Sequence, residues 1–299
     1  MKEDLVTVVI PTHRGCEKIH KTVSSALKQS YINLEVIVVD DNGKGCEEQI
    51  KTEKALSPLL SDGRLTYVVH DVGRNGAAAR NTAMKMSRGR YIAFLDDDDE
   101  YKPECIEKEV EAFNRLSDDY GIVFVSFLQI REGMKDKVVI SSFDGDVLED
   151  FLLGRIESPS SVVMIKREVM ETVGLWDESF CRHQDWEYFA RIMYRYKAYG
   201  ITDVLVLRPV LERHSAKNPN LYEQQRMHYL NKMSEIIESC LKDVQKAIYD
   251  RHYRDISKAY LKNKKFVMCI RWTFKTSQPI KNTLLLFSDA LSYLKNAVN

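Results

Sequence analysis

Four consecutive aspartates, Asp96–Asp99, are the residues best suited to chemistry, and they follow the apolar segment YIAFL. Carboxylates this close repel one another, so the cluster is costly unless water or a cation neutralises it. A solvated acidic turn is the structural alternative. An EF-hand calcium loop is excluded, because Tyr101 stands where that loop needs glycine. We predict a hard divalent cation, Mn²⁺ or Mg²⁺, bound by carboxylate oxygen together with substrate phosphates.

Asp41 and Asp185 are two further carboxylates placed for function. Asp41 is the second acid of the pair that ends the apolar segment Leu34–Val39. Asp185 lies at the start of a predicted helix with one apolar face, in RHQDWEYFARIMY. An N-cap role is the structural alternative for Asp185. Its functional role would be that of a general base, which takes a proton from an attacking hydroxyl, with Glu187 as the second choice.

Apolar segments of strand length position these acids. Helical segments at Glu17–Gln29 and, opened by Gly76, at Ala77–Ser87 alternate with them. Such a pattern predicts a Rossmann-like α/β fold, with a mostly parallel sheet covered by helices on both faces. Ligands of these sheets bind beyond the carboxyl ends of the strands, so the aspartates should meet at one edge. The predicted strands are Leu5–Ile10, Leu34–Val39, Leu65–Val69, Tyr91–Leu95 and Ile122–Phe127.

The second half of the chain is mixed and then helical. Helices are expected at Val147–Leu153 and from Gln184 to about Tyr196, and strands at Ser161–Ile165 and Val204–Leu207. From Tyr222 onward the pattern is helical, with a break at Pro279. We predict a catalytic domain at 1–215, with a nucleotide-binding half (1–103) and an acceptor-side half (104–215). Residues 216–299 form a basic helical extension.

Five segments, taken in order, resemble family 2 of the inverting glycosyltransferases, which have the GT-A fold. The resemblance is dense over Leu5–Pro103 and looser as far as Glu187, and the order and spacing of the segments carry it. It implies transfer of a sugar from a nucleotide-diphosphate donor, with a UDP-sugar expected, to an acceptor hydroxyl. The segments are VTVVIPTHR, SSALKQSYINLEVIVVDD, NGAAARNTAM, GRYIAFLDDDDEYKP and QDWE.

The acidic positions take their implied roles from that resemblance. Asp41 resembles the acid that accepts the ring N–H of uracil. Asp96 and Asp98 resemble the DxD motif, with Asp98 on the metal and Asp96 on the ribose or on metal-bound water. Asp97, between them, is grouped with the nucleotide-binding residues. Asp185 resembles the aspartate that removes the acceptor proton, although Gln184 stands where an acid is common.

Several other positions complete the expected pocket. Pro11 and His13 would line the nucleotide site, where the family often has Tyr-Asn in place of His13-Arg14. Gly76 and Arg80 lie at a helix start, and both a helix N-terminus and an arginine suit phosphate. The alternative for Arg80 is a structural tie between helix and sheet. His214, in LERHSAKNP, would approach the metal or diphosphate, or else be an ordinary surface histidine.

Charge is distributed unevenly along the chain. Residues 251–299 hold ten Lys or Arg against two Asp, a net charge of +8, and the whole chain is formally neutral. Overall charge therefore indicates no nucleic-acid partner. Basic residues interleave with aromatics there, and an apolar stripe follows at Leu284–Leu294. These helices either pack on the catalytic domain or contact an anionic membrane surface.

The expected cellular compartment rests on the cysteine pattern and on the hydropathy of the chain. Its six cysteines form no CxxC pair, its N-terminal segment has no signal-peptide pattern, and no apolar run reaches membrane-spanning length. We expect a cytoplasmic protein, free or peripheral at the inner face of a membrane, with a glycan or a lipid-linked acceptor. The alternatives are a non-catalytic nucleotide-sugar-binding or membrane-scaffold protein, and a nucleotidyltransferase, which THRGCEK matches poorly after the first strand.

Overall fold

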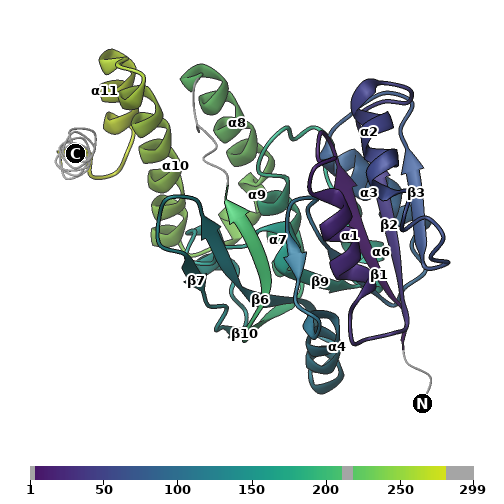
Figure 1. The fold of residues 1–299 in the computed structure, drawn as a ribbon. Helices are drawn as coiled ribbons and strands as arrows, with labels where there is room; N and C mark the ends of the chain where they lie inside the picture. Colours follow the sequence, from purple (N-terminus) through teal and green to yellow (C-terminus); the bar gives the residue numbers. More distant parts are fainter. Residues whose placement is uncertain (1–3, 211–217, 281–299) are drawn as a thin grey trace. The chain divides into compact units, whose positions relative to one another are not determined.

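The structure is a computed structural model that describes residues 4–210 and 218–280. The chain divides into two compact units. The first consists of Met1–Leu148 and Ile156–Glu212, and the second of Glu149–Arg155 and Arg213–Asn299. Figure 1 follows the chain through both units in sequence colours.

One twisted sheet organises the first unit, and it is mostly parallel as predicted. The strands β1–β4 all run parallel, and β9 is inserted antiparallel between β4 and β6. Because β9 opposes both neighbours, β6 and β10 run in the same direction as β4. The order is β3 (Leu65–Val69), β2 (Leu34–Asp40), β1 (Val6–Thr12), β4 (Tyr91–Phe94), β9 (Val163–Lys166), β6 (Tyr120–Arg131), β10 (Lys197–Val210), β5 (Glu100–Tyr101), with β7 (Lys137–Val139) on β6 and β8 (Asp144–Gly145) on β10.

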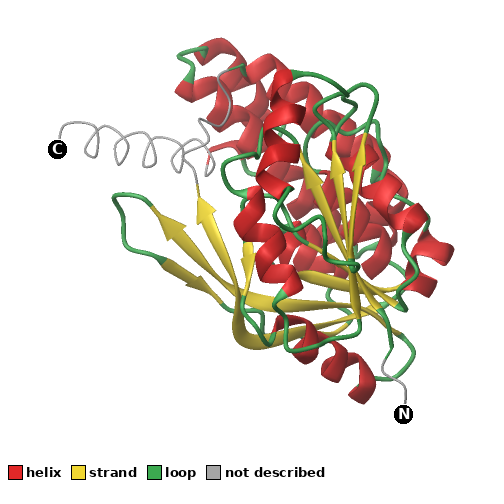
Figure 2. Ribbon diagram, turned by 45° about the vertical axis from the view of Figure 1, so that its right-hand side comes forward, coloured by secondary structure: helices red, strands yellow, loops and turns green. Residues whose placement is uncertain are grey.

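Helices connect the strands and cover both faces of the sheet (Figure 2). α1 and α2 contact each other, whereas α3 crosses back over β1 and β2. Since parallel crossovers are right-handed, α3 covers the face opposite α1 and α2. The helices of this unit are α1 (Ile19–Leu27), α2 (Glu47–Leu56), α3 (Gly76–Met86), α4 (Cys105–Arg115), α6 (Arg167–Val173) and α7 (Gln184–Met193), with a 3-10 turn at Ser160–Val162; α5 (Leu148–Leu152) leads into the second unit.

The first strand is longer than its sequence suggests. β1 continues through Pro11 to Thr12, and Pro11 pairs with Val39 of β2. The neighbour on its other side pairs no further than Val9 with Phe94. The missing N–H of proline therefore costs no ladder hydrogen bond. The nitrogen of Pro11 points to the β4 side of β1, and the pairing with β4 ends before this residue.

The second unit is helical, with α8 (Pro219–Lys232), α9 (Ser234–Ser239), α10 (Lys242–Lys262) and α11 (Phe266–Phe274). Its core includes Ile256, Tyr260, Cys269 and Trp272 from α10 and α11. No helix within the described ranges is both long and apolar enough to cross a bilayer. The predicted stripe Leu284–Leu294 lies outside the described residues.

Candidate active site

The aspartate turn begins where β4 ends, at the carboxyl edge of the sheet. Asp99 N–H donates to Asp96 C=O at 3.1 Å, which closes the turn. Asp96 accepts from Arg80 Nη2 at 2.6 Å and from Ser160 Oγ at 2.9 Å. Burial alone would raise the pKa of Asp96, but Arg80 and Arg208 beside it hold that pKa below its ordinary value. Asp96 is therefore an anion fixed by the protein itself.

Asp97 points into the loop that follows β1. Its Oδ2 accepts from Thr12 Oγ1 at 2.7 Å and from the His13 N–H at 3.1 Å. Burial raises the pKa of Asp97 to about 6. A Cβ on Gly15 would lie 2.0 Å from the same Oδ2, so this loop can approach Asp97 only because residue 15 has no side chain.

Asp99 is almost completely buried beneath the turn. Arg208 Nε donates to its Oδ2 at 2.8 Å, and Ser161 Oγ donates at 2.5 Å. Burial raises the pKa of Asp99 to about 7, against the opposing effect of Arg208. Arg208 comes from β10, whereas Ser161 belongs to the 3-10 turn before β9, so elements far apart in the sequence fix the turn.

Asp98 differs from its three neighbours because no described residue hydrogen-bonds to its carboxylate. Its one ionic contact within the described chain is Lys18 Nζ at 4.0 Å, and its side chain is 20% exposed. Across the described residues, no group of three or more His, Cys, Asp or Glu could hold a metal ion. One available carboxylate still fits Mn²⁺ or Mg²⁺, which bind proteins through one or two carboxylates and take other ligands from substrate phosphates and water.

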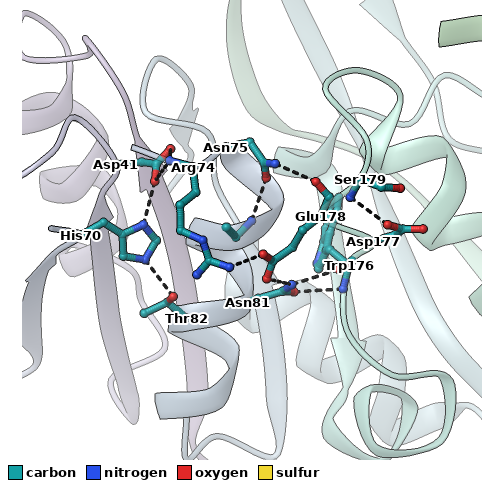
Figure 3. A network of polar contacts seen from close by, with 11 residues as sticks. Asp41, His70, Arg74, Asn75, Asn81, Thr82, Trp176, Asp177, Glu178 and Ser179 are labelled. Carbon is teal, nitrogen blue, oxygen red and sulfur yellow. Dashed lines mark hydrogen bonds and ion pairs between the residues drawn. The ribbon is translucent and has the colours of Figure 1, made fainter. Parts of the chain in front are cut away.

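Asp41 lies at the carboxyl end of β2, in a polar network shown in Figure 3. His70, which follows β3, contacts Asp41 Oδ1 through Nδ1 at 2.7 Å and Thr82 Oγ1 through Nε2 at 2.8 Å. The Arg74 N–H donates to both Asp41 oxygens at 3.0 and 3.1 Å. These contacts fix the orientation of the carboxylate at the strand end.

The same network reaches the loop that precedes α7 (Figure 3). The Arg74 guanidinium pairs with Glu178, and Asn75 Nδ2 donates to the Glu178 carbonyl at 2.8 Å. Asn81 of α3 donates to the Trp176 carbonyl at 2.9 Å and accepts from the Trp176 N–H at 2.9 Å. Asn75 also caps α3 by accepting from Ala78 N–H. The start of α3 therefore holds residues 176–178 in place.

Arg80 links the aspartate turn to the start of α7. Besides Asp96, it contacts Gln184 Oε1 through Nη1 at 3.3 Å, and its guanidinium stacks 4.8 Å from the Trp176 ring centre. Gly76, one turn earlier, lets the guanidinium lie close, since a Cβ there would be 3.0 Å from Nη1. These contacts tie α3 to the aspartate turn and to α7, and the binding of phosphate or nucleotide by Arg80 stays a prediction.

Asp185 follows Gln184 in the first turn of α7. The residue before the helix is His183, in a left-handed conformation (φ 62°) and without a capping side-chain bond. Burial raises the pKa of Asp185 to about 6, and nearby Arg80 and the Trp186 N–H oppose that rise. Glu187 is different, because Arg191 Nε and Nη2 donate to its two oxygens at 2.5 and 3.0 Å. Glu187 is therefore held in an ion pair with Arg191.

The structure brings most of the sequence-predicted residues to one edge of the sheet. Pro11 is buried in β1, while the His13 side chain is exposed and only its N–H is used. His214 lies outside the described residues. Sequence reasoning missed a second set of polar partners that fix these groups. His70 and Arg208 follow or end strands at the same edge, so the strand-end rule could have found them. The set is Thr12, His70, Arg74, Ser160, Ser161, Glu178 and Arg208.

A family model described as glycosyl transferase family 2 matches residues 7–167, more than half of the chain. This chain belongs to glycosyl transferase family 2. The amylovoran biosynthesis glycosyltransferase AmsB of Erwinia amylovora is 29% identical over 220 residues, which are 72% of this chain and 71% of AmsB. The Escherichia coli enzyme WfgD, a UDP-Glc:alpha-D-GlcNAc-diphosphoundecaprenol beta-1,3-glucosyltransferase, is 33% identical over 40% of this chain and 46% of its own.

Solved structures show the same fold. A mannosyltransferase from Pyrobaculum calidifontis, in complex with GDP-Man and Mn²⁺, has a TM-score of 0.62 at 19% identity over 97% of this chain and 80% of that one. S. aureus TarS 1–349 with UDP-GlcNAc has a TM-score of 0.59 at 11% identity over 91% and 90%. The predicted GT-A fold is confirmed, and the chain is a glycosyltransferase of this family.

Proposed function

We propose that this family 2 glycosyltransferase is an inverting, metal-dependent enzyme that uses a nucleotide-diphosphate sugar. One observation carries the proposal: Arg80 bridges Asp96 and Gln184, so the aspartate turn and Asp185 belong to a single site. A leaving diphosphate at Asp98 and a base at Asp185 are the two elements that a single displacement needs.

The reaction that these residues support has one step. An acceptor hydroxyl oxygen attacks C1 of the donor sugar on the face opposite the diphosphate, and the bond from C1 to the diphosphate oxygen breaks. The hydroxyl proton goes to Asp185, whose pKa of about 6 leaves it ionised at neutral pH. A divalent ion on Asp98, and on His214 as the sequence predicts, would neutralise the leaving diphosphate.

UDP-sugars are the donors that we propose. Asp41 would accept a hydrogen bond from the N3–H of uracil, and the contacts from His70 and the Arg74 N–H would fix the orientation of its carboxylate. Pro11, His13, Gly76 and Asp97 would line the same pocket. A guanine ring also offers an N–H, and the two solved relatives bind UDP-GlcNAc in one case and GDP-Man in the other. A donor screen must therefore include both UDP-sugars and GDP-sugars.

We propose a glycan or a lipid-linked acceptor in the synthesis of a surface polysaccharide. AmsB is named for amylovoran biosynthesis, and the similar Bacillus subtilis protein TuaG is named a putative teichuronic acid biosynthesis glycosyltransferase. A diphosphoundecaprenol acceptor is named for WfgD.

We also propose that residues 1–215 are the catalytic domain, and that residues 216–299 bring this domain to the cytoplasmic face of an anionic membrane.

A donor screen tests the proposal. Purified protein is incubated with several UDP- and GDP-sugars, with Mn²⁺ or with excess EDTA, and nucleotide release is measured. We expect release from at least one UDP-sugar with Mn²⁺, and none with EDTA.

The matched variants are Asp98→Asn and Asp203→Asn, the second at an exposed aspartate on β10. Asp98→Asn should abolish release, since it removes the carboxylate that we place on the metal, and Asp203→Asn should behave as wild type. Undiminished release in EDTA, or an active Asp98→Asn variant, would falsify the metal assignment.

A further inference from the structure

Helix α11 carries an apolar stripe that faces outward from its own unit. Phe266, Val267, Ile270 and Phe274 are between 56% and 81% exposed. At 100° per residue these four side chains fall within one narrow arc of the helix surface. We call them the α11 stripe. Four large exposed apolar side chains on a nine-residue helix are more than scattered surface residues, and such a patch marks an interaction surface.

The opposite face of α11 is fixed, so the stripe is presented by a rigid element. Cys269 and Trp272 are buried against Ile256 and Tyr260 of α10, which lies beside α11 (Figure 1). Trp272 Nε1 donates to Glu223 Oε2 at 3.0 Å. Ser257 Oγ donates to the Cys269 carbonyl at 2.9 Å. Rotating α11 to bury the stripe would break these contacts.

Basic side chains border the stripe, and two acids that reach this region from other helices, Glu223 and Asp250, are bonded to Trp272 and Ser277. Arg271 and Lys275 follow Val267 around the helix, and Lys275 Nζ lies 4.1 Å from the Trp272 ring centre. The sequence has no Asp or Glu between Asp255 and Asp289. The exposed basic residues of this region in the described part are Lys258, Lys262, Lys264, Lys265, Arg271 and Lys275.

We propose that the α11 stripe enters the headgroup region of an anionic lipid bilayer, with the flanking Lys and Arg on lipid phosphates. At about 14 Å, a nine-residue helix is too short to span a bilayer and suits a position in the plane of the interface. An apolar arc next to a basic arc is the surface that anionic lipid complements, because each basic residue gains from the negative surface potential. The inference deepens the proposed membrane site of action, and it assigns that contact to named residues.

Vesicle flotation tests the proposal with the full-length protein and without donor or acceptor. Vesicles of phosphatidylcholine alone are compared with vesicles that also contain phosphatidylglycerol, at low and at high salt. We expect wild type to float with the anionic vesicles only, and less at high salt. Ile270→Glu/Phe274→Glu should lower the partition coefficient at least tenfold. Lys265→Gln/Arg271→Gln should lower it about fivefold for each charge removed.

Matched controls separate the lipid contact from folding and from transfer. Ile32→Glu and Ile140→Glu remove equally exposed apolar side chains from the first unit and should float as wild type does. All variants should keep the wild-type melting temperature and should release nucleotide from a sugar donor at the wild-type rate. If neither wild type nor any variant released nucleotide, the proposed function would be refuted. The flotation experiment would still test the lipid contact, because it uses neither donor nor acceptor.

Four results would overturn the proposal. Wild type could fail to float with anionic vesicles. The stripe variant could float as well as wild type. Third, removal of Pro279–Asn299 could create vesicle binding that the full chain lacks. A dimer in light scattering that Ile270→Glu/Phe274→Glu converts to a monomer would instead assign the stripe to a second copy of the chain.

Discussion

At the residue scale, four neighbouring aspartates have four different environments. Asp96 is paired with Arg80, Asp97 is fixed by Thr12, and Asp99 is buried against Arg208. Asp98 alone keeps its carboxylate free of hydrogen bonds from the described residues. The sequence predicts the cluster and its role but cannot rank its members, because the ranking depends on partners that are 16 to 109 positions away.

His70 provides a test of nucleobase recognition at this scale. If Asp41 reads uracil, His70→Asn should lower the preference for UDP over ADP about tenfold. The reason is that a hydrogen bond to a charged group contributes roughly 1.5–3 kcal/mol, and its loss frees the Asp41 carboxylate to turn. Calorimetry with both nucleotides in Mn²⁺ measures the ratio.

The matched control is His20→Asn, at an exposed histidine of α1. Affinity for Mn²⁺-pyrophosphate should stay the same in both variants, since it involves no base. An unchanged UDP-to-ADP ratio in His70→Asn would remove His70 from base recognition.

At the element scale, the sequence predicts the strongly apolar strands well and the weakly patterned elements poorly. β3 has the predicted bounds, Leu65–Val69. Helix α2 is missing from the prediction because EEQIKTEKAL has little apolar periodicity and its N-cap is Cys46, a weak acceptor rather than the usual Ser, Thr or Asp. β10 runs from Lys197 to Val210 with register shifts, where only Val204–Leu207 is expected, because Gly200 and Asp203 interrupt its apolar pattern.

The position of β9 in the sheet could not be predicted from the sequence. Its residues are recognisable as a strand, but its antiparallel insertion between β4 and β6 is a matter of long-range pairing. Local pattern does not encode which neighbours a strand takes. The insertion matters, since it brings Ser160 and Ser161 onto the aspartate turn.

Helix α4 gives a prediction about stability. Burial raises the pKa of Glu109 to about 8 from an ordinary 4.5. The folded state therefore holds a proton that the unfolded chain releases, and stability should fall as pH rises from about 4.5 through 8. Glu109→Gln should remove up to about 1.4 kcal/mol per pH unit of that slope. Urea unfolding at pH 5.5, 7 and 8.5 measures it.

Glu111→Gln on the same helix is the control, since Glu111 is 44% exposed and pairs with Arg115. It should keep the wild-type slope. If Glu109→Gln also keeps that slope, Glu109 does not hold a proton in the folded state.

At the scale of the whole molecule, the fold and the family follow from the sequence, whereas the network that supports the site does not. The strand-end rule brings Asp41, Asp96 and Asp98 to one edge, and the structure confirms that convergence. Arg80 and Gln184 then connect that edge to α7, across 104 positions of chain. The second unit adds a basic, partly apolar surface that the net charge of zero conceals.

Catalysis by Asp185 is the central claim, and turnover of Asp185→Asn beside its UDP affinity tests it most directly. Wild-type kcat/KM should rise with pH up to about 6 and then level, because the base works only when ionised. Asp185→Asn should lose roughly 10²–10⁴-fold in turnover and keep its UDP affinity, since other groups hold the donor. Glu171→Gln, at an exposed acid on α6, should match wild type in both. Near-normal turnover in Asp185→Asn, or a parallel loss of UDP binding, would contradict the account.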